Sequence, residues 1–128
     1  VVQLDLNFTP VLMEANPLVE DTLNQVAVKC GPLVYCLESN DLPAGVRLED
    51  VALPLDCHFT PVREQIAGAE LTALAVTALD LPREAHSAGR LYRPVDLAPP
   101  RKIPIRLVPY YAWDNRGDTE MTVWLPLR

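Results

Sequence analysis

The sequence has little glycine, cysteine and histidine, with five, three and two of these residues in 128. No apolar run approaches the roughly 20 residues that cross a bilayer, and no basic stretch leads into an apolar one at the start. The sequence therefore shows neither a membrane span nor a visible targeting signal. Nucleotide motifs such as G-x-G-x-x-G and the nucleophile elbow G-x-S-x-G are also absent, so nothing indicates a nucleotide site or a serine hydrolase.

What the sequence does contain is typical of one globular domain. Apolar residues make up 49%, charged residues 22%, and the net charge of -6 would repel nucleic acid. A chain of 128 residues is long enough to bury a core without disulfides or metal ions. It begins "VVQLDLNF", without Met and already in an alternating pattern, so we expect residues 1–128 to be one domain of a longer protein.

Short apolar runs punctuated by thirteen prolines predict strands rather than long helices. Residues 80–100 carry four prolines and no sustained period, which predicts a long surface loop. So many short strands favour an all-β fold, an antiparallel β-sandwich of which the jelly roll is one form. The predicted strands cover residues 2–8, 11–16, 26–38 with an interruption at Gly31-Pro32, 46–54, 67–79, 102–113 and 120–127. Residues 67–79 are rich in alanine and also suit a helix, but their alternating apolar residues favour a strand.

The closing segment, Pro109–Pro126, has two interpretations. Aromatic rings beside polar groups suit a sugar, which offers apolar faces to the rings and hydroxyl groups to the acids. The candidate residues for such a site, or for a domain interface, are Tyr110, Tyr111, Trp113, Asp114 and Arg116. Acids and glycine are equally the ordinary composition of a turn, and the segment then forms the last hairpin of the sheet.

A catalytic interpretation of the same segment rests on its carboxylates. Glycosidases use two acids about 5 to 10 Å apart, and Asp114, Asp118 and Glu120 lie close together in the sequence. Because turns contain such acids for other reasons, we expect no catalytic residue among them.

The cysteines predict packed thiols rather than a disulfide or a metal site. Six residues of extended strand separate Cys30 from Cys36 by about 20 Å, far beyond the ~7 Å limit for a disulfide, unless the chain folds back at Gly31-Pro32. Cys57 and His58 are neighbours, but zinc ligands are normally two to four residues apart. Unpaired thiols favour the cytoplasm, which is the bacterial cytoplasm if the family resemblance described next holds, although a secreted parent protein remains open.

Two longer motifs resemble a known family. "GPLVYCLE" at Gly31–Glu38 and "PYYAW" followed by "NRG" at Pro109–Gly117, with Trp124 in the final strand, resemble the C-terminal region of bacterial glycoside hydrolase family 127. These are β-L-arabinofuranosidases, and the region was formerly a domain of unknown function. Cys30 stands where the family tends to have arginine, and "MEANP" at Met13–Pro17 also fits.

The resemblance implies an accessory role. Family members carry a zinc-held cysteine nucleophile in an upstream helical barrel, and none of those motifs lies in these 128 residues. The resemblance therefore implies a non-catalytic β-sandwich without cofactor that packs against the catalytic domain of its parent chain. Tyr110, Tyr111, Trp113 and Arg116 are then expected at that interface or in the sheet core. The alternative is a carbohydrate-binding module for arabinose-containing glycans that uses Tyr111, Trp113 or Trp124 for stacking and Asp114 with Arg116 for hydrogen bonds.

Overall fold

A computed structural model describes residues 1–4, 8–82 and 89–128. The described residues form nine strands in one antiparallel sheet, which confirms the all-β prediction. The order is β1-β2-β3-β7-β6-β4, while β5 pairs with β6, β8 with β3 and β9 with β2. The strands are β1 Pro10–Met13, β2 Gln25–Cys30, β3 Leu33–Glu38, β4 Val51–Ala52, β5 Thr60–Ile66, β6 Ala69–Asp80, β7 Arg101–Pro109, β8 Met121–Thr122 and β9 Leu125–Pro126.

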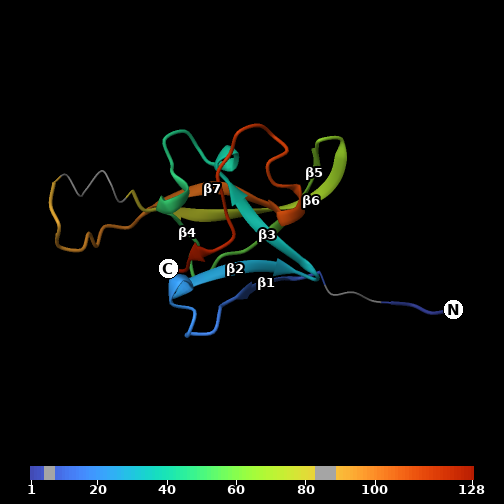
Figure 1. Ribbon diagram of the computed structural model, residues 1–128, viewed down its shortest axis with the longest axis horizontal. Coiled ribbons are helices and arrows are strands. Elements are labelled where there is room, and N and C mark those ends of the chain that lie inside the picture. Colours follow the sequence, from blue (N-terminus) through green and yellow to red (C-terminus); the bar gives the residue numbers. More distant parts are fainter. Residues whose placement is uncertain (5–7, 83–88) are drawn as a thin grey trace.

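The sheet curls around its core. Figure 1 shows β1 and β2 on one side of the molecule and β6 and β7 on the other, with β3 crossing between them. The main core lies in the space enclosed by these strands, and its largest fully buried side chains include Leu37, Leu53, Leu74, Leu107 and Leu125. The fold is thus sandwich-like, although one continuous sheet supplies both layers.

The first two-residue turn explains the predicted interruption at Gly31-Pro32. The chain folds back there, so that Cys30 pairs with Leu33 and Lys29 with Val34. Gly31 has a φ of 57°, which suits the first central position of a type II′ hairpin turn. The second central position of such a turn accepts a proline, here Pro32. The predicted long strand 26–38 is therefore two strands of a hairpin.

Other strand predictions need correction. Residues 1–4, 8 and 9 form no strand and Pro10 begins β1 rather than ending an earlier strand, while residues 5–7 lie outside the described residues. In the predicted strand 46–54, Leu48–Asp50 forms the 3-10 helix η3 and only Val51–Ala52 is strand. Residues 81, 82 and 89–100 form no helix or strand, as expected for a loop, and residues 83–88 of that loop are not described.

The predicted closing hairpin is also wrong. β7 pairs with β3 and β6, whereas β8 pairs with β3 and β9 pairs with β2. The 3-10 helix η5, Tyr110–Ala112, ends β7 and turns the chain away before it can return alongside β7. Among the described residues there is also no helix long and apolar enough to cross a bilayer.

Candidate functional site

The tyrosines of the closing segment lie on the surface. Pro109, the last residue of β7, is buried and pairs with Tyr35 of β3, and η5 follows directly. Within η5 Ala112 is buried, while Tyr110 is 48% and Tyr111 64% exposed. The hydroxyl of Tyr35 donates to the Thr72 carbonyl oxygen at 2.9 Å, and burial is the main cause that raises its pKa. The two tyrosines of η5 are therefore free to meet a partner or a ligand.

Trp113 has a different position from the tyrosines. It packs with Met121 and Val123 against a second apolar cluster on the outer face of the sheet. Neighbouring residues of β3 divide between the two faces, since Tyr35 belongs to the main core and Cys36 to the second cluster. Trp113 thus helps to cover the outer face, which leaves less of its ring for a sugar. The cluster consists of Cys36, Ile66, Leu71, Ala73, Val108 and Ala112.

Arg116 is held by two buried carboxylates. Its Nη1 and Nη2 donate to Oδ1 and Oδ2 of Asp41 at 2.9 and 2.6 Å, and Nη2 also pairs with Oε2 of Glu38. The Glu38 and Asp41 side chains are 0% and 1% exposed. Their hydrogen bonds raise the pKa of Arg116, led by those of Asp41, so the guanidinium stays charged. A side chain held in this way has little freedom to bind a sugar hydroxyl.

Further hydrogen bonds fasten the turn beyond Arg116 to the 3-10 helix η2, Ser39–Asp41. The Ser39 amide donates to the Glu120 carbonyl oxygen at 2.9 Å, and the Glu120 amide donates to Ser39 Oγ at 3.1 Å. Asn40 Nδ2 donates to the Arg116 carbonyl oxygen at 3.3 Å. Arg106 of β7 continues the charged network, because it pairs with Asp41 and with Glu64 of β5. The turn is therefore a well-anchored part of the fold.

The three acids proposed as a catalytic cluster are all exposed. Asp114 has a φ of 63°, a left-handed conformation that aspartate tolerates better than most residues, and its backbone N–H donates to Glu38 Oε1 at 2.9 Å. Asp118 and Glu120 follow in the same surface turn. The buried acids Glu38 and Asp41 were missed in the sequence, although an acid that ends the apolar run of β3 is a signal for a buried partner.

The cysteines are free and protonated in the folded chain. Cys30 packs in the main core and Cys36 in the second cluster, so they lie on opposite faces of the sheet. Burial raises the pKa of Cys36 to about 12 and also raises the pKa values of Cys30 and Cys57. In the described part of the chain no three His, Cys, Asp or Glu side chains gather closely enough to hold a metal ion.

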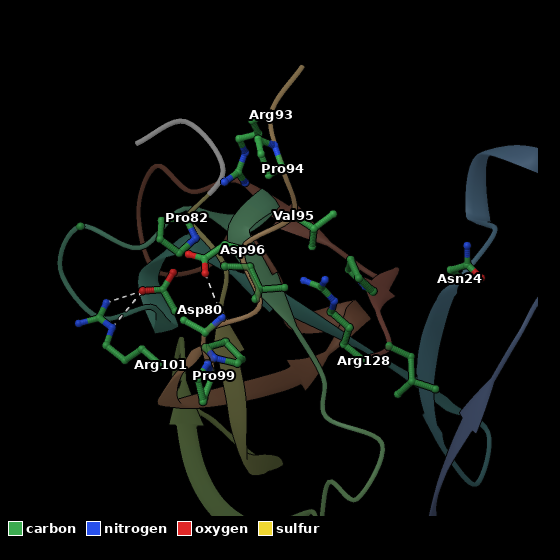
Figure 2. A pocket seen from close by; sticks show the side chains of 16 residues that line it. Asn24, Asp80, Pro82, Arg93, Pro94, Val95, Asp96, Pro99, Arg101 and Arg128 are labelled. Atoms are coloured by element: carbon green, nitrogen blue, oxygen red, sulfur yellow. Dashed lines mark hydrogen bonds and ion pairs between the residues drawn. The ribbon is translucent and has the colours of Figure 1, made fainter. Parts of the chain in front are cut away.

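A large groove lies at another place on the molecule, below the long loop. It has a volume of about 920 Å³ and is lined by residues 93–96 and 98–100 of that loop, by the end of β6 and by the end of the chain from Pro126. Figure 2 shows Arg101 paired with Asp80 at its edge, where Nε and Nη2 donate to Asp80 Oδ2 at 3.0 and 2.6 Å. The lining residues include Arg93, Val95, Asp96, Pro99, Leu127 and Arg128.

Comparisons with known proteins agree over nearly the whole chain. A family model described as "Glycoside hydrolase family 127 C-terminal domain" matches residues 10–126. The curated non-reducing end β-L-arabinofuranosidase of Bifidobacterium longum subsp. longum is 34% identical over 131 residues, which cover 96% of this chain and 19% of that protein.

Two solved structures show the same fold. One, a glycoside hydrolase, is 46% identical with a TM-score of 0.84 over 96% of this chain and 20% of its own. The other is Ara127N-Se, a GH127 β-L-arabinofuranosidase from Geobacillus stearothermophilus T6. It is 34% identical with a TM-score of 0.77 over 94% of this chain and 18% of its own. The chain thus spans about a fifth of the length of the relatives it matches.

Proposed function

Since the chain belongs to the glycoside hydrolase family 127 C-terminal domain family, as its motifs predicted, we propose that it is a non-catalytic accessory domain that packs against the catalytic domain of its parent polypeptide. The parent is then a β-L-arabinofuranosidase like its relatives, with zinc only in the catalytic domain. The observation that carries the proposal is an apolar surface that this domain leaves uncovered. An uncovered apolar surface of this kind usually marks an interface.

That surface, called the sheet-face patch below, consists of Val11, Met13, Val34, Tyr110 and Tyr111. Val11 pairs with Lys29 and Lys29 pairs with Val34, so Val11 and Val34 share one face of the sheet, with the exposed Lys29 between them. The η5 helix lies against β3 and adds the two tyrosines. Each of the five side chains is at least 40% exposed.

The chemistry of the remaining groups supports a structural role. The acids of the closing turn are exposed, whereas the general acid of a glycosidase lies in an apolar pocket. Burial raises the pKa values of the three thiols, which disfavours the nucleophilic thiolate. Trp113 and Arg116, proposed for the interface, contact the second apolar cluster and the buried acids. We therefore assign them the role of holding η5 in place, and Tyr110 and Tyr111 the role of contact.

The test uses the complete polypeptide and substitutions in the patch. Changing Val34 and Tyr111 together to Asp should lower the unfolding temperature of the complete polypeptide more than that of the 128-residue chain, because a charge would enter a buried interface only in the former. Leu18→Asp with Leu55→Asp is the matched control, since both leucines are exposed elsewhere on the domain. Equal effects of both pairs in the complete polypeptide would refute packing through this patch.

A second candidate function rests on the two adjacent exposed tyrosines, which could stack on a sugar ring. It is the carbohydrate-binding module, with Tyr111 as the platform and the exposed Asp114 as a hydrogen-bonding partner. Trp113 lies two residues away and would report binding. Titrating the chain with arabinose-containing oligosaccharides while following tryptophan fluorescence tests it, with Tyr111→Ala as control. An unchanged spectrum at millimolar sugar removes this function.

A further inference from the structure

A second group of exposed apolar side chains lies in the long loop that precedes β7. Residues 89–98, called the arm below, stand away from the body of the domain as an orange loop in Figure 1. Within the arm Leu91 is 93%, Tyr92 91%, Val95 71% and Leu97 90% exposed. Single exposed apolar residues are ordinary, but four within seven positions of one segment, Leu91 to Leu97, are an unusual concentration.

The composition of the arm suits docking. Pro94 lies within the arm and Pro99 and Pro100 follow it, so the backbone has few conformations to lose on binding. Arg90 and Arg93 add positive charge to a chain whose net charge is -6. Within the described residues the Arg93 side chain forms no hydrogen bond or ion pair, although it lines the groove of about 920 Å³. Arg101 in the same groove is already paired with Asp80.

We propose that the arm inserts Leu91, Tyr92, Val95 and Leu97 into an apolar recess on the rest of the same polypeptide, whose rim supplies carboxylates to Arg90 and Arg93. The proposal rests on the proposed accessory function, to which it adds a second contact. The groove between the arm and the body receives the rim of that recess. The arm is thus a second point of attachment to the rest of the polypeptide, in addition to the sheet-face patch, and docking of the arm is called the clasp below.

The length of the relatives favours the same polypeptide over a second copy of this chain. The chain covers about a fifth of each relative, so their remaining residues offer a tethered surface. A tether gives an effective concentration in the millimolar range, which a separate molecule rarely matches. The match to the solved glycoside hydrolase covers 96% of this chain but only 20% of that longer protein.

The experiment measures how fast a cysteine in the arm reacts with a maleimide. Leu91→Cys is introduced into the 128-residue chain and into the complete polypeptide, and the peptide that carries residue 91 is followed by mass spectrometry. We expect labelling about tenfold or more slower in the complete polypeptide, because docking must open before the thiol reacts. Leu18→Cys, 89% exposed outside the arm, is the control and should react equally fast in both.

A charge substitution tests the second half of the proposal. Arg93→Glu should return the labelling rate of Leu91→Cys in the complete polypeptide most of the way to that of the 128-residue chain. Arg63→Glu is the matched control, because Arg63 is exposed and pairs only with the exposed Glu70 among the described residues. Equal rates for both charge variants would overturn the pairing with carboxylates.

The outcomes separate the arm from the accessory function. If residue 91 reacts equally fast in both proteins while Val34→Cys is protected, the accessory function holds and the clasp is refuted. If neither position is protected, both are refuted. Slow labelling of residue 91 in the 128-residue chain, with a rate that falls as its concentration rises, would instead assign the arm to a second copy and overturn the proposal.

Discussion

Arg116 and Asp41 form a two-point ion pair although 75 positions separate them in the sequence. Asp41 lies on η2 next to the end of β3, and Arg116 lies in the turn that follows η5. The pair therefore holds the closing segment against the middle of the sheet. Glu38 pairs with the same guanidinium and also accepts the Asp114 backbone N–H, so one buried site fixes both ends of the turn.

We expect Arg116→Ala to be among the most destabilising single changes in this chain. It would leave Glu38 and Asp41 buried without their cation, although Arg106 still lies 3.5 Å from Asp41. Removing one partner of a buried ion pair costs about 3 kcal/mol or more. Urea unfolding followed by tryptophan fluorescence measures the change in the free energy of unfolding.

Arg63→Ala is the matched control for Arg116→Ala. Its ion pair with Glu70 is exposed on both sides, and such pairs contribute about 0.5 kcal/mol or less. A loss for Arg116→Ala no larger than that for Arg63→Ala would show that the buried network does not stabilise the fold.

Substitutions in the two-residue turns at Gly31 and Ala67 should change the free energy of unfolding in opposite directions. Gly31 has a φ of 57°, so Gly31→Ala should lower the free energy of unfolding by about 1 kcal/mol. Ala67 in the turn between β5 and β6 has a φ of 49° and precedes Gly68 at 80°, the pattern of a type I′ turn that favours Asn-Gly. Ala67→Asn should therefore raise the free energy of unfolding by about 0.5 kcal/mol.

Thermal unfolding monitored by circular dichroism compares these turn variants with the unchanged chain. Two changes in the same direction would contradict the assigned turn conformations. Because both positions lie outside the two apolar clusters, packing does not obscure the comparison.

The sequence predicts some parts of this fold well and others poorly for physical reasons. Alternation within Ala69–Asp80 and Arg101–Pro109 marks strands because these strands pair with each other over much of their length and bury residues against the core. The alternation in residues 2–8 does not mark a strand, because a strand needs a partner strand to pair with. No strand of the structure includes residues 1–4 or 8. The alternation of apolar and polar residues shows that a segment could form a strand. It does not show whether another strand lies close enough to pair with it.

The candidate site shows a similar limit. Composition and the family motif drew attention to Tyr110, Tyr111 and Trp113 together, but burial separates them, because only Trp113 packs against the second cluster. The closing hairpin was predicted from proximity in sequence, whereas β8 pairs with β3 across a long separation. The apolar run of β3 that Glu38 ends could have marked this acid as buried, but its partner Arg116 lies 78 positions away, so no local pattern could identify the pair.

Trp113→Ala and Tyr111→Ala should separate the structural aromatic residue from the exposed one. Trp113 is half-buried on the second apolar cluster, so its removal should lower the free energy of unfolding by about 2 kcal/mol, less than for a fully buried tryptophan. Tyr111 is 64% exposed, and its loss should change the free energy by about 0.5 kcal/mol or less. Chemical unfolding of the 128-residue chain, followed by circular dichroism, measures both. Equal losses would mean that Tyr111 also supports the fold, and would weaken its assignment to a contact surface.

Cys36 should make the fold sensitive to alkaline pH. Burial, the largest cause, raises its pKa from 9.0 in an exposed thiol to about 12 in the folded chain. Because the folded state holds this proton more tightly than the unfolded state, the stabilising contribution is complete below pH 9 and is lost as the pH rises towards 12. The urea concentration at the unfolding midpoint should therefore fall steadily over this range.

Cys36→Ala should make that fall shallower, although burial of Cys30 and Tyr35, whose pKa values are also raised, preserves part of it. Cys57→Ala is the comparison and should make the fall shallower by less than Cys36→Ala does, because the pKa of Cys57 is also raised but Cys57 is only partly buried. If Cys36→Ala and the unchanged chain lose stability with the same slope above pH 9, the thiol of Cys36 ionises as easily in the folded state as in the unfolded one, and the second apolar cluster does not exclude water from it.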